Sequence, residues 1–205
     1  MATGPASRLP AAERRRQLLD VSVELFAERG FDGTSMADLA EAAGVTKPVL
    51  YQHFRSKRAL YAELLEEVSH LLLDQVAKAA AAADGPHAQV RAGFKAYFRF
   101  VDERRSAFQL LFLGGSRHDR ELTAAVDRLE EAMADVIGPM IEAGIDNQHR
   151  RQLALALVGM AEATGRRAVI DRDLAGGAGL DDMAGRLAEL AWAGLRGIRP
   201  VGEGA

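Results

Sequence analysis

Apolar residues recur every three or four positions along most of the chain, which is the spacing of one face of an α-helix. No stretch alternates in the manner of a strand, and no segment of 20–50 residues repeats. The pattern therefore predicts an all-α fold of about nine helices. Helices are expected at residues 10–29, 57–83, 106–113, 120–143, 147–173 and 180–198. Two more short helices are expected within 34–57, and another helix is expected to follow Pro86.

Glycine and proline mark the expected breaks. Gly138 and Pro139 fall inside the 120–143 helix, where proline removes a backbone hydrogen bond, so we expect a kink there. The glycine-rich run 175–179 is expected to be a flexible connection. Residues 1–9 are expected to be a disordered tail, and residues 200–205 a second tail.

The segment 34–57 carries the most specific local signals. Ser35 followed by Asp38 is a carboxylate version of the capping box, which starts a helix. Gly44 is placed to end that helix in the left-handed conformation, and Thr46 with Pro48 begins the next one. Leu50 and Phe54 share one face of this second helix. Helix, tight turn and helix are the arrangement that places a helix in a DNA major groove.

Charge supports a DNA-binding role for this segment. The whole chain has a net charge of −3, but residues 1–60 hold 9 Lys and Arg against 7 Asp and Glu, a net of +2. No acidic residue occurs between Glu41 and Glu63. A basic, acid-free window suits a phosphate backbone. Gln52 can pair with adenine, Lys47 can donate to guanine, and Pro48 and Val49 suit a thymine methyl group.

The run from Gly44 to Phe54, followed by Lys57 and Leu60, resembles the DNA-binding signature of the tetracycline-repressor (TetR) family of bacterial regulators. Upstream matches are Phe26, Gly30, Phe31, Thr34 and Ala40. The resemblance covers about the first 60 residues. It implies a helix-turn-helix domain at 10–56, and a helical ligand-binding and dimerisation domain at 57–199. It also implies a homodimeric repressor on a palindromic operator. The DNA contacts that it implies are Lys47, Pro48, Val49, Tyr51, Gln52, His53 and Lys57. We add Thr46, whose hydroxyl can donate to a phosphate.

Aromatic and sulfur-containing side chains gather in the second half of the chain. They could line an apolar pocket for a small hydrophobic or amphipathic effector, or simply form core. Tyr97, His70, Arg99 and Thr164 are candidate polar groups for such a ligand. The full candidate set is His70, Phe94, Tyr97, Phe98, Phe100, Phe108, Phe112, Met133, Ile137, Met160 and Thr164.

The two C-terminal helices favour a dimer interface. Large apolar residues in 180–198 alternate at steps of three and four, as in a coiled coil, while small residues in 147–173 would let another helix approach closely. Intramolecular core is the alternative. The expected interface residues are Ala156, Gly159, Ala163, Leu180, Met183, Leu187, Leu190 and Gly194.

Other functional classes lack their residue patterns. The chain has no cysteine, and its five histidines do not cluster in sequence. One Glu-x-x-His spacing, at Glu67 and His70, is too little for a di-iron site. No nucleophile motif or Walker lysine occurs, so we expect no enzyme, no cofactor and no metal. No apolar run is long enough for a membrane span, and we expect a cytoplasmic protein. Two alternatives stay open, namely a constitutive DNA-binding protein without effector and a helical enzyme with an appended DNA-binding head.

Overall fold

The computed structural model describes residues 10–113, 120–171 and 177–198. Within these ranges the chain forms nine α-helices and one 3₁₀ turn, with no strand, which confirms the all-α prediction. The helices are α1 (Ala11–Arg29), α2 (Met36–Ala42), α3 (Lys47–His53), α4 (Lys57–Ala81), α5 (Pro86–Glu103), α6 (Arg105–Phe112), α7 (Arg120–Ile137), α8 (Asn147–Ile170) and α9 (Gly177–Arg196).

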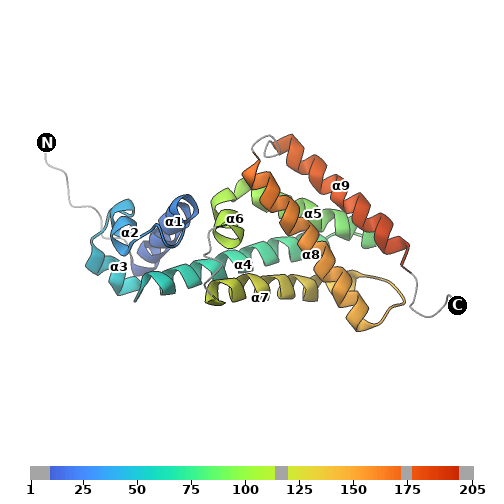
Figure 1. The fold of residues 1–205 in the computed structure, drawn as a ribbon, viewed down its shortest axis with the longest axis horizontal. Helices are drawn as coiled ribbons and strands as arrows, with labels where there is room; N and C mark the ends of the chain where they lie inside the picture. The colour runs from blue at the N-terminus through green and yellow to red at the C-terminus, as the bar shows by residue number, and fades with distance from the viewer. Residues whose placement is uncertain (1–9, 114–119, 172–176, 199–205) are drawn as a thin grey trace.

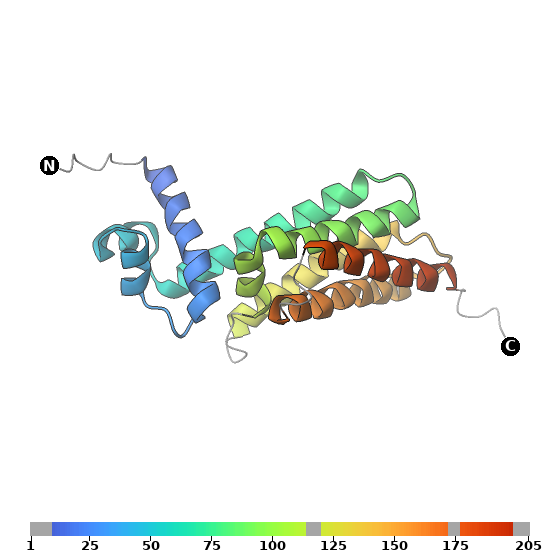
Figure 2. The same cartoon turned by 90° about the horizontal axis from the view of Figure 1, so that it is seen from above.

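The molecule is elongated, with a small group of helices at one end. Helices α1, α2 and α3 form this group, which we call the head (Figure 1). Helix α4 starts under the head and runs into the body, which consists of α5 to α9 (Figures 1 and 2). A single straight helix thus joins the two parts.

The predicted caps of the head are present. The Ser35 hydroxyl accepts from the amides of Ala37 and Asp38, and the Asp38 carboxylate accepts from the Ser35 amide at 2.8 Å, completing a capping box. The hydrogen bonds from Ser35 hold the pKa of Asp38 below its usual value. Gly44 has a φ of 64°, the left-handed conformation expected after the helix. Thr46 occupies the N-cap position of α3, but its side chain makes no capping hydrogen bond.

One predicted helix is shorter than expected. Helix α7 ends at Ile137, and Gly138–Met140 form a 3₁₀ turn instead of a kinked continuation to residue 143. Pro139 has no amide hydrogen to donate to the helix ladder, so the helix stops before it. The following loop is held by Arg150, whose guanidinium donates to the carbonyls of Ile141 and Ala143 at 3.2 and 3.1 Å.

The glycine-rich connection is also shorter than predicted. Helix α9 begins at Gly177, so residues 177–179 belong to the helix rather than to a loop. Residues 175 and 176 lie outside the described residues, as do the two expected tails at 1–9 and 200–205.

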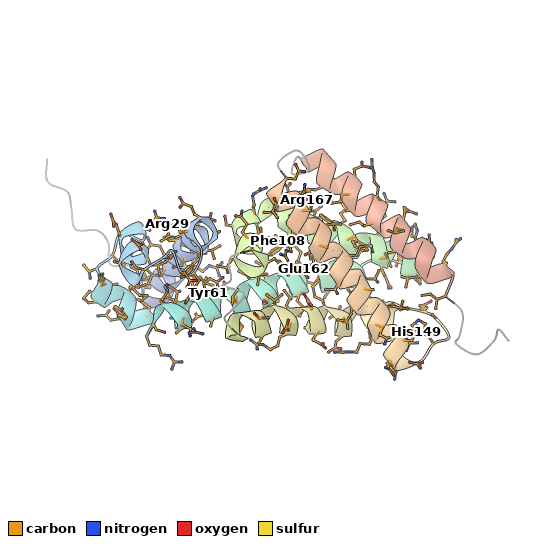
Figure 3. All side chains as sticks on the ribbon, in the orientation of Figure 1. Arg29, Tyr61, Phe108, His149, Glu162 and Arg167 are labelled. Atoms are coloured by element: carbon orange, nitrogen blue, oxygen red, sulfur yellow. The ribbon has the colours of Figure 1, made fainter. Side chains whose placement is uncertain are left out.

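The core of the head continues into α4. The Tyr61 ring, fully buried near the start of α4, lies edge-on to Phe26 at 4.9 Å and to Phe31 at 5.0 Å between centroids. Its hydroxyl donates to the carbonyl of Leu110 in α6 at 3.2 Å. Burial raises the pKa of Tyr61 to about 12, so the hydroxyl keeps its proton and remains a donor. Tyr61 therefore joins head and body (Figure 3).

Helix α9 packs against α5 through a stripe of small residues. Leu180, Ala184, Ala188 and Ala191 are its buried positions, spaced four, four and three apart. Alanine side chains let the two helix backbones approach closely. This stripe differs from the seam of larger residues that the sequence suggested, and only Leu180 belongs to both.

Candidate nucleic-acid interface and ligand cavity

Helix α3 presents most of its polar side chains to solvent. Leu50 is completely buried and Phe54, just after the helix, is nearly so, and the two anchor the helix on the head. Tyr51 keeps half of its surface exposed, which is unusual for a large aromatic side chain. Of the other predicted contact residues, Thr46, Lys47, Pro48 and Gln52 are exposed, and Val49 and His53 are half-buried.

Lys57 has an internal role that the sequence did not reveal. Its ammonium donates to the carbonyls of Phe31 and Thr34 at 2.6 and 2.7 Å, and lies 4.2 Å from the centre of the Phe31 ring. These bonds tie the start of α4 to the loop before α2. A lysine ammonium has three hydrogens, so one remains for a DNA phosphate. Replacing Lys57 would therefore disturb the head as well as any phosphate contact.

The arginines that begin α1 are also engaged inside the molecule. Arg15 donates to the His53 carbonyl at 2.8 Å and to the Glu63 carboxylate at 2.6 and 2.5 Å. Arg16 pairs with Glu67 of α4. Arg14 bonds Gln17 of its own helix. Arg15 and Arg16 thus fix α1 against α3 and α4.

The body contains an apolar cavity of about 190 Å³. It is bounded by the C-terminal half of α4, the first two-thirds of α5, the end of α7 with its loop, the middle of α8 and the end of α9. All of these elements except the middle of α8 meet at the end of the body far from the head (Figure 1). Its lining includes Val76, Ala80, Val90, Gly93, Phe94, Tyr97, Met133, Ile137, Ile141, Val158, Ala161 and Trp192.

Four of the predicted ligand residues line this cavity, namely Phe94, Tyr97, Met133 and Ile137. The structure places the others elsewhere. Phe98, Phe100 and Phe108 are fully buried in the surrounding core, and the Phe112 ring packs on Phe108 in a tilted arrangement at 4.7 Å between centroids. The Thr164 hydroxyl donates to the Met160 carbonyl of its own helix at 2.6 Å, and His70 lies on the exposed side of α4.

The sequence pattern did not predict several of the lining residues. The aromatic-rich segment of α5 and α6 drew attention, whereas Trp192 lies almost a hundred residues further along the chain. Packing of α9 on α5 brings Trp192 to the cavity, and its ring also lies against His87 in a tilted arrangement at 5.1 Å between centroids. The one tryptophan of the chain was the available signal. Gln89, Glu142 and Arg196 supply polar groups to the lining.

Helices α8 and α9 share an exposed face of small and apolar residues. On α8, Ala156, Gly159 and Ala163 are exposed, and 62% of the Ile170 side chain is accessible. On α9, Leu190 is 62% exposed, Gly194 is exposed, and Met183 and Leu187 are half-buried. Leu180, by contrast, is buried within the chain. Figure 1 shows the two helices running across one side of the body.

Two family models match the chain and together cover most of it. "Bacterial regulatory proteins, tetR family" matches residues 18–64, and "Tetracyclin repressor-like, C-terminal domain" matches residues 86–194. The second match alone covers more than half of the sequence. The chain belongs to the TetR family. The resemblance found in the first 60 residues is thereby confirmed and extended to the body, and the chain is a helix-turn-helix transcriptional regulator of a non-enzymatic family.

Individual TetR-family relatives are similar to this chain over much of their length. The chain is 33% identical over 162 residues to the HTH-type transcriptional activator FasR of Mycolicibacterium smegmatis, covering 78% of this chain and 74% of FasR. A TetR-like regulator from Rhodococcus sp. RHA1 superposes with a TM-score of 0.73 and 30% identity, over 93% of this chain and all of that one. AibR, solved with isovaleryl coenzyme A and operator DNA, gives 0.69 at 20% identity, covering 86% and 97%.

A pair of carboxyl groups lies near Tyr97 in this TetR-family body. Glu130 of α7 is hydrogen-bonded to Glu162 of α8, and Arg166 donates to Glu162 at 3.1 Å (Figure 3 labels Glu162). Partial burial and the Glu162 carboxylate raise the pKa of Glu130 to about 7. Near neutral pH the two carboxyl groups therefore share a proton.

The described residues contain neither a metal-binding cluster nor a membrane-spanning helix. No three histidine, aspartate or glutamate side chains among them are grouped so that they could hold a metal ion. Within the same residues, no helix of this TetR-family chain is long and apolar enough to cross a membrane.

Proposed function

We propose that this chain regulates transcription as a homodimer that inserts two copies of α3 into successive major grooves of a palindromic operator. The observation that carries the proposal is the surface of α3: exposed polar side chains on one side, and the buried anchors Leu50 and Phe54 on the other. In such dimers the half-sites lie one helical turn apart, roughly 34–36 Å.

Each exposed residue of α3 has chemistry that suits a role on DNA. The Lys47 ammonium and the Gln52 amide can reach base edges, and the Tyr51 hydroxyl can donate to a phosphate. Pro48 and Val49 offer apolar contact to a thymine methyl group. The Thr46 hydroxyl is free of a capping bond and can donate to a phosphate too, with His53 and Lys57 at the margin.

Operator binding by variants of α3 tests this proposal. A duplex selected from a random pool by the purified protein would serve as the operator. Lys47→Ala should weaken its binding about tenfold and make the logarithmic salt dependence shallower by about 1. Tyr51→Phe should weaken binding several-fold at every salt concentration. Lys95→Ala, which removes an exposed lysine of α5, is the matched control. Unchanged binding by both head variants would contradict the assignment.

We further propose that a small amphipathic ligand occupies the cavity and controls operator binding. The cavity is mostly apolar, as ligand sites in helical proteins are. AibR, a member of the same fold, was solved with isovaleryl coenzyme A, so a short acyl thioester is the class to test first. Such a ligand acts only if it binds the DNA-free conformation better than the DNA-bound one. Isovaleryl coenzyme A should release operator DNA, and free coenzyme A should not.

We propose that the protein represses transcription. The relative FasR, by contrast, is named an activator. Deleting the gene should raise transcription from a promoter that carries the operator. A fall in transcription would instead make the protein an activator. In either case it acts where chromosomal DNA is, in the cytoplasm.

A further inference from the structure

The lining of the cavity shows where it meets solvent. Two of its lining residues are exposed, Glu142 in the loop after α7 and Arg196 at the end of α9. Phe94, Met133 and Val158, by contrast, are buried and line the cavity away from solvent. The separate cleft between head and body shares no lining residue with this cavity. A ligand from solvent therefore meets the cavity between the loop and the end of α9.

The loop side of this opening is held in place by α8. The Arg150 guanidinium donates to the carbonyls of Ile141 and Ala143 at 3.2 and 3.1 Å. These two residues flank Glu142 in the chain, and Ile141 is also buried. The loop is thus fixed on both sides of its exposed lining residue.

The α9 side of the opening is held by smaller contacts. The one large buried residue of α9 is Leu180, which lies near its start, far along the helix from Arg196. Toward the opening, the buried positions are Ala184, Ala188 and Ala191. An alanine methyl group buries little apolar surface, so each of these contacts contributes little to holding the helix. The end of α9 is therefore easier to displace than the loop.

His87 links this end of α9 to the start of α5. Its Nε2 donates to the Glu189 carboxylate at 3.1 Å, which is the one side-chain hydrogen bond between α9 and another helix within the described residues. Its ring also lies 5.1 Å from the Trp192 ring between centroids. Glu189 and Trp192 are three positions apart, so they share one side of α9. His87 thus contacts two successive turns of α9 near the opening.

Trp192 is the largest side chain on the α9 side of the opening. It is half-buried and lines the cavity. It precedes Arg196 by four residues, so both lie on the same side of the helix. His87 is not itself a lining residue and touches Trp192 from outside the cavity. Without His87, the alanine contacts alone would hold this end of α9 on α5.

We infer that ligands enter the cavity between the loop at residues 141–143 and the end of α9, and that His87 is the positioning residue that keeps Trp192 and this end of α9 in the closed position. The inference rests on the proposed ligand cavity but not on operator binding. The loop stays on α8, and α9 moves aside for the ligand. Because His87 lies outside the cavity, loosening it speeds entry and exit equally and changes affinity little.

The binding kinetics of an uncharged apolar fluorophore test this inference without DNA. The probe is N-phenyl-1-naphthylamine, and energy transfer from Trp192, the one tryptophan of the chain, reports its binding in stopped-flow mixing with the purified full-length protein. His87→Ala removes an exposed hydrogen-bonded pair, so the association and dissociation rate constants should both rise about threefold. The dissociation constant should stay within about twofold of the wild-type value.

Three further variants define what the rates report. His87→Gln keeps a donor for Glu189 and should return both rate constants toward the wild-type values. Arg186→Ala, which loses an exposed ion pair with Asp182 inside α9, is the matched control and should leave both unchanged. Gly93→Val adds a side chain to the cavity lining, where a Cβ has room, and should weaken binding of the probe.

The exposure of Trp192 gives a second readout in the free protein. Collisional quenching of its fluorescence by acrylamide should increase in His87→Ala, while circular dichroism shows unchanged helix content. The inference is overturned if His87→Ala leaves both rate constants unchanged, or if it alters affinity through only one of them. The proposed cavity would then stand with another entrance. Failure of the wild type to bind the probe would overturn both the entrance and the ligand cavity.

Discussion

At the scale of single residues, Arg15 shows how the head is held together. Its guanidinium bonds the carbonyl at the end of α3, pairs with Glu63 of α4, and lies 4.4 Å from the centre of the Phe54 ring. The side chain is only partly exposed, so these bonds are screened less than those of a surface pair. Arg15 thereby links the start of α1 to both helices that position the DNA-binding surface.

Replacing Arg15 should therefore destabilise the head. Arg15→Ala removes charge-assisted bonds to two other elements, and we expect the free energy of unfolding to fall by about 1–2 kcal/mol, since solvent screens part of the ion pair. Urea denaturation followed by circular dichroism measures this. Arg14→Ala, which loses only a bond to Gln17 in its own helix, is the control and should change stability by less than about 0.5 kcal/mol. Equal effects of the two variants would contradict the role given to Arg15.

Because the pKa of Glu130 is raised, we expect the stability of the folded protein to depend on pH. Its pKa is about 7 in the folded chain and lower in the unfolded chain, so the folded state binds more protons between about pH 4.5 and 7. Stability contributed by this group is therefore lost as pH rises through 7. Glu130→Gln should stabilise the protein at pH 8, on the order of 1 kcal/mol after allowing for solvent screening, and have no such effect at pH 4.5.

Thermal melts of wild type and variant across this pH range would measure the effect. Glu66→Gln, which changes an exposed carboxylate of α4, is the control and should follow the wild-type profile. If the difference between Glu130→Gln and wild type were independent of pH, the shared proton between Glu130 and Glu162 would not exist.

At the scale of elements, α8 depends on a close approach at Gly165. A Cβ there would lie 3.1 Å from ring atoms of Phe108 and Tyr97, which are themselves packed edge-on. Gly165→Ala gains helix propensity but forces these rings to move, so we expect the free energy of unfolding to fall by about 1–2 kcal/mol. Gly185→Ala, at a helical glycine with no atom within 4 Å, should raise it by up to about 1 kcal/mol. Chemical denaturation compares the two; a stabilised Gly165→Ala would show that the rings yield easily.

Local sequence signals predicted the positions of the helices better than they predicted which side of each helix is buried. The Ser35 capping box, the Gly44 end and the helix pair up to Lys57 depend on neighbours within one or two turns, so they could be found without the fold. The end of α7 was missed because the apolar spacing continues past Pro139 while the backbone cannot. Which side of α9 faces α5 depends on long-range packing, and the buried alanines carried too little hydrophobic signal to show it.

Local sequence signals also could not predict which residues line the cavity. The proposed DNA contacts all lie within a dozen positions of one another, where spacing alone decides which side they share. The cavity, by contrast, collects residues from five helices, and Val76 and Trp192 are 116 positions apart. Composition could indicate that an aromatic-rich body exists. It could not distinguish Phe100, which is packed in the core, from Phe94, which faces the cavity.

At the scale of the whole molecule, two routes of contact join head and body. One is α4, which passes from the head core at Tyr61 to the cavity wall at Val76. The other is the contact of α1 with α6, where the Ser106 hydroxyl donates to the Glu24 carboxylate at 2.5 Å. A cleft of about 370 Å³ lies between these routes, lined by charged residues of both signs. We propose that a shift at the far end of α4 reaches the head through this helix.

The exposed face of α8 and α9 predicts how two such molecules associate. A dimer that buries Ala163 and Leu190 would bring together small and apolar side chains that now face water. Leu190→Asp combined with Ala163→Glu should place unpaired charges there and separate the chains, while helix content stays unchanged because both positions are exposed. Light scattering after gel filtration should show the mass falling from two chains to one. His70→Asp, on the exposed side of α4, should leave the mass of two chains. A double variant that remained dimeric would place the interface elsewhere, and the spacing of the two heads would then have to be set by another surface.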